Sequence, residues 1–328
     1  MKYFCHVCEK KFQSKKLLYY CTCGNVLEIV DKELKFEKIS MGEGNTPLIF
    51  LKDLNIYLKL EYLNPTGSFK DRGSAIEIGY AVSMGFKKVC TASTGNMGVS
   101  ISAYSSFANL TPIVFLTRTT SEKKIEQLKF FNAKIIKGFN TYKEALEFCE
   151  KKHSENKWFL AGDYGLRVEG QKIIAREIIS QLGDLPDVVI TPIGNGNLFF
   201  SLHKGFSEFK ESVKIIGVQA SGCNPLYKAF SKKSERFEPV KKAMTKASCI
   251  ACEDPIWGKN VLKLCYEFGY EIHQASDKSM EKSKKFLGGK GIFVELGSAS
   301  TLSVYLKLRD KLKDKKVVLI LTGSGLKE

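Results

Sequence analysis

From about Lys87 onward the chain alternates apolar strands with helices, and this alternation constrains the fold more than any other feature. The strand segments include KKVCTAS from Lys87, TPIVFL from Thr111 and VVLILTG from Val317, each almost continuously apolar. Strands that alternate with helices predict parallel sheets joined by right-handed crossovers. Apolar runs without a polar alternation are typical of strands that are covered on both faces. We therefore expect an α/β fold built on parallel sheets.

Composition favours a soluble enzyme over a membrane or nucleic-acid-binding protein. The chain has 328 residues, of which 44% are hydrophobic, and this is enough for two domains with cores of their own. No apolar stretch is long enough for a membrane span or for a secretory signal, so a cytoplasmic location is expected. The net charge is +16, but the lysines are scattered in short clusters, and such scattered charge is typical of a solvated surface.

The first 35 residues contain two cysteine knuckles. Cys5 and Cys8 form the first, and Cys21 and Cys23 form the second. Four thiolates suit a tetrahedral zinc ion, and a segment too small for a core gains stability from a metal. The second knuckle has one intervening residue instead of the usual two. A ribbon that packs without metal is therefore the alternative to a zinc site.

The segment Asn64–Gly73, which reads NPTGSFKDRG, places a lysine at a predicted helix start. A tight Pro-Thr-Gly turn comes first, and Ser68 is predicted to cap the helix. A lysine acts as a covalent catalyst when its surroundings favour the neutral amine, and such lysines commonly carry pyridoxal phosphate. Lys70 is therefore the candidate catalytic residue. The alternative is an ordinary solvated lysine in a surface helix.

Three further motifs follow predicted strands, at the edge of a parallel sheet where ligands collect. Ser93–Asn96 opens a helix and suits an anion such as a carboxylate. Gly194–Asn197 allows a phosphate to approach the backbone closely, and the lack of a third glycine and of a carboxylate after the next strand argues against a dinucleotide. Thr322 offers a hydroxyl after the last strand. Each motif has an ordinary strand-to-helix turn, or a chain end, as its alternative.

With these motifs in order, the chain resembles the threonine synthase family, pyridoxal-phosphate enzymes of the tryptophan-synthase-β fold group (fold type II). The resemblance runs over nearly the whole chain and includes the small N-terminal ribbon. The matching segments are GEGNTPL at 42–48, NPTGSFKDRG at 64–73, RVEGQK at 167–172, the glycine loop at 194, ACEDP at 251–255 and TGSGLKE at 322–328. It implies a zinc-ribbon-like segment at 1–35, a large cofactor-binding domain from 36–80 and 157–328, and a small α/β domain at 81–156.

The resemblance also implies roles for individual residues. The cofactor would be held covalently by Lys70, at its ring oxygen by Asn96, at its phosphate by Gly194, Asn195, Gly196 and Asn197, and at its pyridine nitrogen by Thr322. The substrate would meet Ser93, Thr94 and Gly95, with Lys124 and Arg167 holding its phosphate. The metal, if present, would be bound by Cys5, Cys8, Cys21 and Cys23.

The implied reaction converts O-phospho-L-homoserine and water to L-threonine and phosphate in a homodimer. Three departures from the family pattern concern the site: Met97 follows the Ser-Thr-Gly-Asn stretch, Ala161–Asp163 replaces an Asn-Ser pair, and the glycine loop is one residue short. A different pyridoxal-phosphate lyase or synthase, acting for example on phosphoserine with a sulfur nucleophile, is therefore a second hypothesis. A basic zinc-ribbon protein that binds nucleic acid is a third, much weaker one.

Overall fold

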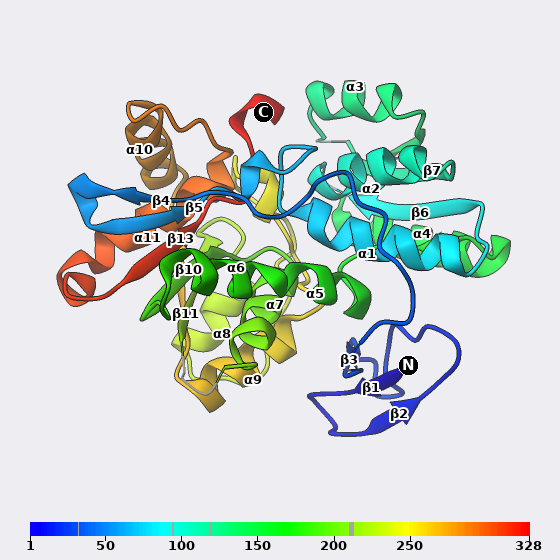
Figure 1. Ribbon diagram of the computed structural model, residues 1–328, viewed down its shortest axis with the longest axis horizontal. Coiled ribbons are helices and arrows are strands. Elements are labelled where there is room, and N and C mark those ends of the chain that lie inside the picture. The colour runs from blue at the N-terminus through cyan, green and yellow to red at the C-terminus, as the bar shows by residue number, and fades with distance from the viewer. Residues whose placement is uncertain (32, 94, 119, 210–212) are drawn as a thin grey trace.

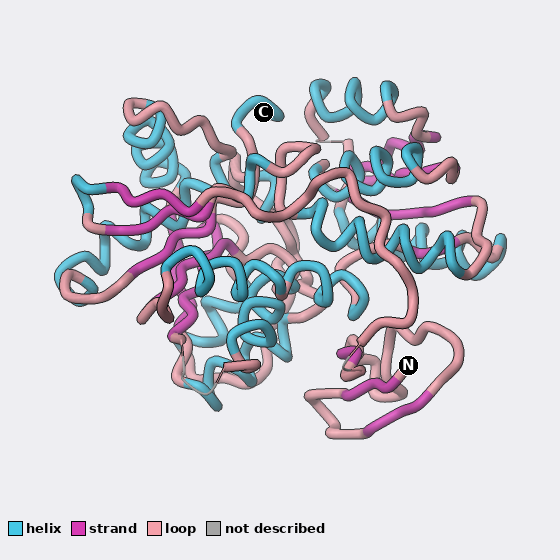
Figure 2. Tube along the Cα trace, viewed as in Figure 1, coloured by secondary structure: helices cyan, strands magenta, loops and turns pink. Residues whose placement is uncertain are grey.

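The structure is a computed structural model that describes residues 1–31, 33–93, 95–118, 120–209 and 213–328. The described residues form three β-sheets, two of which belong to α/β layers that lie side by side, while the third belongs to the N-terminal segment below them (Figure 1). The strands gather into separate groups wrapped by helices and loops (Figure 2). None of the described helices is long and apolar enough to cross a membrane.

The larger sheet has six strands in the order β12-β11-β10-β13-β5-β4. All neighbours run parallel except β4, which pairs antiparallel with β5. The central strands β10 and β13 are buried along their whole length, as expected for a sheet covered on both faces. The bounds are β4 Leu48–Leu51, β5 Ile56–Lys59, β10 Val188–Pro192, β11 Lys214–Ala220, β12 Glu271–Ala275 and β13 Val317–Ile320.

Helices cover both faces of this sheet. Alternate residues of a strand therefore pack into two different hydrophobic cores. Val188 and Ile190 of β10 pack in the core under α11, whereas Val189 between them packs in the core that includes α7. Helix α10 packs along α11, and α6 packs along α7. The bounds are α6 Ile173–Leu182, α7 Asn197–Phe206, α8 Pro225–Ser231, α9 Gly258–Phe268, α10 Asp277–Gly288 and α11 Leu296–Leu312.

The smaller sheet has four parallel strands in the order β8-β7-β6-β9. Helix α4 packs on one face of it and α2 on the other. Helices α1 and α5 pack against each other, and α1 also packs on α2. The bounds are β6 Lys88–Ser93, β7 Thr111–Thr117, β8 Lys134–Phe139, β9 Phe159–Leu160, α1 Lys70–Ser83, α2 Asn96–Phe107, α3 Glu122–Phe130, α4 Tyr142–Asn156 and α5 Gly165–Gln171.

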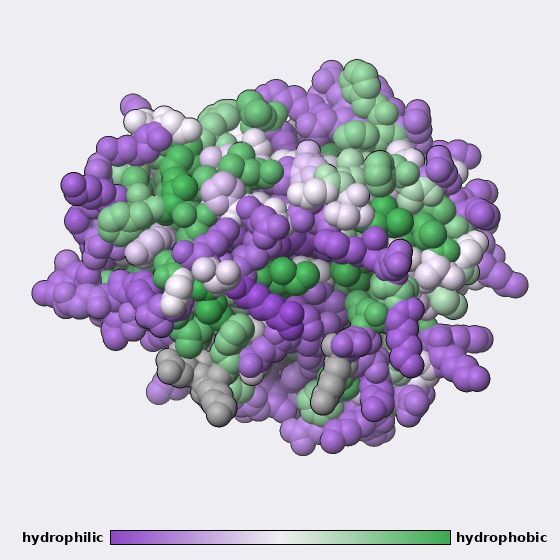
Figure 3. Space-filling view, viewed as in Figure 1, coloured by the Kyte–Doolittle hydropathy of each residue, from purple (hydrophilic) through white to green (hydrophobic). Residues whose placement is uncertain are grey.

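The N-terminal segment is a separate three-stranded antiparallel unit. Its strands are β1 Lys2–Phe4, β2 Lys11–Gln13 and β3 Glu28–Ile29, in the order β2-β1-β3. Short 3-10 turns complete the fold at Lys52–Leu54, Glu61–Leu63, Ser248–Ile250 and Gly325–Lys327. On the face shown in Figure 3 hydrophilic residues prevail, and hydrophobic areas lie over the region of β4 and over α3. Phe50 and Phe130, which belong to those two elements, are exposed.

The predicted α/β fold is confirmed, and one local prediction is wrong. The Ser68 hydroxyl does not cap α1, because its Oγ is buried and has no hydrogen-bond partner among the described residues. The start of α1 is held instead by Asp71, whose carboxylate accepts hydrogen bonds from the Thr66 amide at 2.7 Å and the Thr66 hydroxyl at 2.6 Å. The short strand β9 belongs to the smaller sheet, although the predicted large domain begins at 157; the division into domains itself stays a prediction.

Candidate active site

A cavity lies where the carboxyl ends of strands from both parallel sheets meet the starts of several helices. About 780 Å³ of its space is free of atoms, part of it at the open mouth. Strand ends and helix starts make such an edge the usual ligand site of an α/β fold. The residues that line it are Phe69, Lys70, Ser93, Asn96, Met97, Tyr142, Asp163, Pro192, Gly194, Asn195, Gly196, Asn197, Leu198, Cys249, Ile250, Ala251, Cys252, Glu295 and Thr322.

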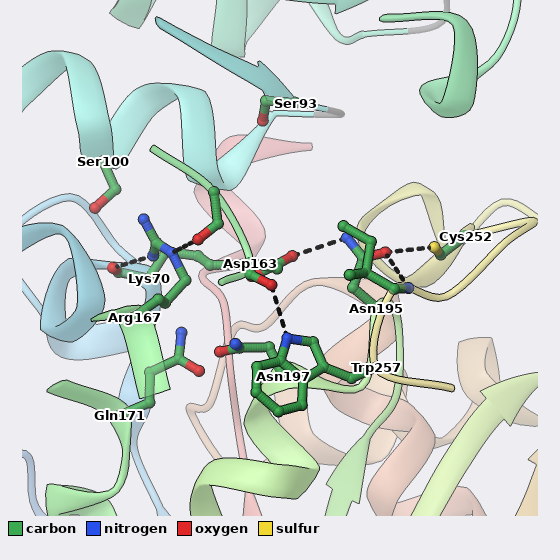
Figure 4. A network of polar contacts seen from close by, with 12 residues as sticks. Lys70, Ser93, Ser100, Asp163, Arg167, Gln171, Asn195, Asn197, Cys252 and Trp257 are labelled. Carbon is green, nitrogen blue, oxygen red and sulfur yellow. Dashed lines mark hydrogen bonds and ion pairs between the residues drawn. The ribbon is translucent and has the colours of Figure 1, made fainter. Parts of the chain in front are cut away.

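Lys70 is the first residue of α1 and projects into this cavity. The Phe69 amide donates to the Thr322 carbonyl at 3.0 Å, so the start of α1 is tied to the end of β13. The Lys70 ammonium lies 2.8 Å from the Asp163 carboxylate and 5.0 Å from the centre of the Phe69 ring. Figure 4 shows Asp163 between Lys70 and Asn195. The cavity therefore contains a lysine in contact with a buried carboxylate.

Asn96 begins α2 and faces a second carboxylate across the cavity. Its Nδ2 donates to Glu295 Oε2 at 2.6 Å, while its Oδ1 is buried without a hydrogen-bond partner among the described residues. Lys124 forms an ion pair with the same Glu295 at 2.9 Å. Burial lowers the pKa of Lys124, but Glu295 outweighs this effect, and the net shift is upward. The second carboxylate thus lies between the Asn96 amide and a fixed ammonium.

The glycine loop forms the wall opposite Lys70 and leads into α7. Gly196 has a φ of +89°, and a Cβ atom there would lie 2.8 Å from Val261 and 3.0 Å from Trp257, so only glycine fits. Asn197 begins α7 and is 2% exposed, and neither its Oδ1 nor its Nδ2 has a hydrogen-bond partner among the described residues. A helix start with free polar groups favours an anion.

Thr322 follows β13 and presents its hydroxyl to the cavity. Its Oγ1 lies 2.9 Å from the hydroxyl of Ser298, which itself accepts a hydrogen bond from the Gly323 amide at 2.8 Å. Ser298 lies in the first turn of α11, so the position of Thr322 is set by a neighbouring helix. A hydroxyl held in this way suits a neutral hydrogen-bond partner.

The predicted substrate residues are not all brought to the cavity. The Ser93 hydroxyl lines it, and accepts hydrogen bonds from the amides of Gly95 and Gly98. The aliphatic stem of Lys124 passes close to Gly95, where a Cβ atom would lie 2.3 Å from Lys124 Cδ. Thr94 lies outside the described residues.

Arg167 is turned away from the cavity and is fully buried. Its guanidinium forms an ion pair with Glu77 and donates to the carbonyl oxygens of Gly162 at 3.1 Å and Lys70 at 2.9 Å. A guanidinium engaged in this way has no face left for a substrate phosphate. In this arrangement Arg167 instead supports the backbone of Lys70 from behind.

The residues of the cavity fit pyridoxal phosphate. Its phosphate would be held by the glycine loop and the unpaired amide of Asn197, where the start of α7 adds a favourable dipole. The ring oxygen would meet Asn96, the pyridine nitrogen would meet Thr322, and the aldehyde carbon would bond to Lys70. The unpaired buried atoms of Asn96 and Asn197 favour a polar ligand, since buried polar groups are normally hydrogen-bonded.

Several residues of the cavity wall were not predicted as site residues from the sequence, and they include Tyr142, Asp163, Cys252 and Glu295. Asp163 was noted only as a departure from a pattern, and Glu295 lies between two predicted elements. Their signals were absent because each acts through a partner far away in the chain, such as Lys70 for Asp163 and Lys124 for Glu295.

The four predicted cysteines come together in the N-terminal unit. The thiol sulfur atoms of Cys5, Cys8, Cys21 and Cys23 all lie within 4.8 Å of one another. The Cys5–Cys23 pair is 3.6 Å apart, and the Cys8–Cys21 pair is 3.4 Å apart. Sulfur atoms around a tetrahedral zinc ion lie about 3.8 Å apart, given a zinc–sulfur distance of about 2.3 Å. The cluster therefore has the donor set and the size of a structural zinc site.

The fold and the site define the class of protein. Residues 39–323 match the family described as "Pyridoxal-phosphate dependent enzyme". This match covers most of the chain, and the chain belongs to the pyridoxal-phosphate dependent enzyme family.

Within that family the chain is similar over almost its whole length to proteins named threonine synthase. It is 33% identical to that of Methanocaldococcus jannaschii, over 99% of this chain and 92% of the relative. It is 29% identical to that of Methanosarcina acetivorans, over 99% and 91% of the two chains. The threonine synthase of Mycobacterium bovis is 31% identical, over 88% of this chain and 84% of its own.

Solved structures share the fold at lower identity. Maize serine racemase superposes with a TM-score of 0.78 at 17% identity, covering 86% of this chain and 88% of its own. A threonine deaminase of Solanum lycopersicum has a TM-score of 0.73 at 21% identity, covering 90% and 89%. These likenesses show the predicted fold group and carry no argument about the substrate.

Proposed function

We propose that this chain is a threonine synthase, which converts O-phospho-L-homoserine and water to L-threonine and phosphate. The observation that carries the proposal is one cavity that joins Lys70, the glycine loop and Thr322 in a chain similar over almost its full length to threonine synthases. The bound cofactor supplies an electron sink for carbanion chemistry. The protein supplies binding, orientation and proton transfer.

Lys70 has the central role in this proposal. Its amine holds the cofactor until the substrate amine takes its place, and it then moves protons at the α and β carbons of the substrate. Lys70 lines a cavity to which residues after strands of both parallel sheets contribute. Asn96, Thr322 and the loop 194–197 fix the cofactor ring and phosphate, as described above.

Lys124 is the better of the two predicted ligands for the substrate phosphate. It is buried beside Gly95 and Glu295, at the edge of the cavity. Lys327 is a second buried ammonium in the same region, where its Nζ donates to the Thr66 carbonyl at 2.7 Å. Burial lowers the pKa of Lys327 to about 8. Arg167 serves in this proposal as a support for α1.

The proposal extends to the surroundings of the enzyme. Zinc in the N-terminal unit is proposed on the strength of the four clustered thiols. We propose further that the protein is a cytoplasmic homodimer, that its substrate is a small amino-acid phosphate, and that it binds neither nucleic acid nor membranes.

The purified protein with O-phosphohomoserine tests the proposal directly. Threonine and phosphate should appear in equal amounts, and the Lys70→Ala variant should release neither above background, because it lacks both the anchor and the proton carrier. Borohydride reduction followed by peptide mapping should find the cofactor on Lys70. Release by Lys70→Ala at the wild-type rate would contradict the proposal.

A second candidate is a pyridoxal-phosphate enzyme that acts on a different β- or γ-substituted amino acid, such as phosphoserine with a sulfur nucleophile. The observation in its favour is that Met97 lines the cavity, whereas Arg167 is turned away from it and engaged with Glu77 and the Gly162 carbonyl, which leaves few groups for a γ-phosphate. A substrate panel followed by cofactor absorbance separates the two candidates. Turnover of phosphohomoserine alone would eliminate the second one.

A further inference from the structure

A buried carboxylate faces the Lys70 amine. Asp163 lies in the loop between β9 and α5, and is 3% exposed. Its Oδ1 is 2.8 Å from Lys70 Nζ, and among the described residues it is the only carboxylate within ion-pair distance of that atom. The family resemblance assigned no role to this residue.

Asp163 is held in place from two other directions. Its Oδ2 accepts a hydrogen bond from Asn195 Nδ2 at 2.8 Å, and its main-chain carbonyl accepts one from Trp257 Nε1 at 2.7 Å (Figure 4). The Asn195 amide is in turn fixed by Cys252, whose thiol donates to Asn195 Oδ1 at 2.9 Å. A carboxylate fixed on both oxygens cannot turn away from the lysine.

The charges around the pair are balanced. Arg167 and Glu77 form an ion pair beneath the same loop, so two cations and two carboxylates are buried together when Lys70 is an ammonium. Burial raises the pKa of Asp163, but Lys70 and then Arg167 outweigh this effect, and the net shift is downward. Burial raises the pKa of Glu77. Asp163 is therefore the more acidic of the two carboxylates.

The remaining titratable neighbours are neutral. Burial, followed by the nearby Asp163 charge, raises the pKa of Tyr142 well above its ordinary value. Burial likewise raises the pKa of the Cys252 thiol. Neither group carries a charge near pH 7, so neither competes with Asp163 as a counter-ion for Lys70.

We propose that Asp163 is a positioning residue that holds the Lys70 nitrogen as its counter-ion. The inference rests on the proposal that Lys70 anchors the cofactor. In the attachment step, the Lys70 ammonium gives one proton to solvent, and the freed nitrogen lone pair forms a bond to the aldehyde carbon. The carbonyl oxygen leaves as water with two protons, one from the nitrogen and one taken from solvent. The third proton stays on the nitrogen, which now shares a double bond with the carbon.

The charge is conserved in this step, since a positive nitrogen faces a carboxylate before and after it. During turnover the freed Lys70 amine takes a proton from the substrate α carbon, and the electron pair of that bond stays with the carbon. The resulting ammonium again faces Asp163. An asparagine at position 163 keeps the shape of the side chain but stabilises neither positive state of the nitrogen.

Two measurements on Asp163→Asn test the inference without substrate. The first is the rate at which the cofactor-free full-length protein recovers its lysine-bound absorbance, measured against pH. The second is the pH at which that absorbance changes in the loaded protein. Both transitions should move to lower pH by about one unit or more, a tenfold change in the proton equilibrium. Asp163→Glu should restore the wild-type positions, and Asp184→Asn, a matched change at a surface carboxylate, should leave them in place.

A folded Asp163→Asn protein in which both transitions occur at the same pH as in the wild type would overturn the inference. If that variant does not fold, the wild-type protein alone decides, because the counter-ion should keep one lysine-bound absorbance band between about pH 6 and pH 9. A change of band within that range would also overturn it. Peptide mapping of the reduced protein shows whether the cofactor is on Lys70 at all, so failure of the proposed anchor is seen separately from failure of Asp163.

Discussion

At the scale of single residues, Glu177 joins three parts of the chain through a buried charge cluster. Its carboxylate lies 2.7 Å from both Lys59 Nζ and an Arg72 nitrogen, and accepts a hydrogen bond from the Asn45 amide at 2.9 Å. Arg72 also holds the buried Glu61 at 2.7 Å. The cluster connects the loop before β4 with the first turn of α1, and so holds the helix that carries Lys70.

Replacing Glu177 by glutamine should destabilise the protein by about 3 kcal/mol at pH 7, because two buried cations lose a partner. Burial raises the pKa of Glu177, but Arg72 and Lys59 outweigh this effect and lower it to about 2. A lowered folded-state pKa stabilises the protein above the unfolded value, and that contribution is lost as pH falls from about 4.5 toward 2. The difference between wild type and variant should therefore shrink in acid.

Urea unfolding at neutral pH and in acid measures this effect. Glu155→Gln is the control, because Glu155 is an exposed partner of Lys151 and Lys152 and should matter little at either pH. A Glu177→Gln variant as stable as the control at neutral pH would contradict the prediction.

The site residues that could be predicted from the sequence are those that their neighbours in the chain identify. Lys70, Asn96 and Asn197 each sit at the start of a helix after a strand or turn, and such a position can be recognised from neighbouring residues alone. Asp163 and Glu295 depend on partners 93 and 171 residues away, and no local pattern marks such pairs. Arg167 matched a motif, but the sequence did not show that Glu77 would enclose it.

At the scale of elements, the start of α7 depends on how closely α9 approaches it. Gly196 ends the glycine loop with a left-handed backbone, and Val261 and Trp257 occupy the space where a side chain would begin. The helix start therefore reaches the cavity only because two helices pack without a side chain between them.

Gly196→Ala should destabilise the protein by about 2 kcal/mol more than Gly183→Ala, and should weaken retention of the cofactor. Gly183 is the matched control, because it also has a positive φ, +69°, but has no atom within 4 Å of an added Cβ. Both variants carry the strain of a positive φ, so the difference between their stabilities reports the steric overlap at position 196. Thermal unfolding and the cofactor content after dialysis measure the two effects, and equal results for the two variants would contradict the prediction.

The central strands could be predicted from the sequence because both of their faces are buried. The strands β6, β7, β10, β11 and β13 follow from their apolar runs. The edge strand β12 was not assigned, because Glu271, His273 and Gln274 are only partly buried and give the segment a polar composition. The predicted cap at Ser68 was wrong because its hydroxyl has no hydrogen-bond partner among the described residues, and the turn before α1 is held by Asp71 through Thr66.

At the scale of the whole molecule, the N-terminal unit is docked on the segment that carries Asp163. The Tyr19 hydroxyl donates to the Leu160 carbonyl at 3.0 Å, and the Tyr19 and Tyr20 rings both contact Tyr164, at 4.8 and 5.7 Å. These tyrosines directly precede Cys21. The cysteine cluster therefore fixes a surface that supports one wall of the cavity.

Cys23→Ser should reduce the zinc content from about one ion per chain to almost none, and should lower the unfolding temperature. Cys23 is exposed, so its replacement would matter little if the unit were held by packing alone. Elemental analysis and thermal unfolding with and without a chelator measure the effect. Cys265→Ser, outside the cluster, should keep the zinc; a zinc-free wild-type protein would contradict the prediction.

The place of β13 in the larger sheet has a consequence for how the chain is made. This strand lies between β10 and β5, so residues near position 57 pair with residues near position 318. The ribosome synthesises β5 long before β13. Until β13 has been made, the hairpin of β4 and β5 has one unpaired strand edge. A nascent chain that has not yet reached β13 lacks both the partner of β5 and Thr322, so the wall of the cofactor site can be completed only after that strand has been made.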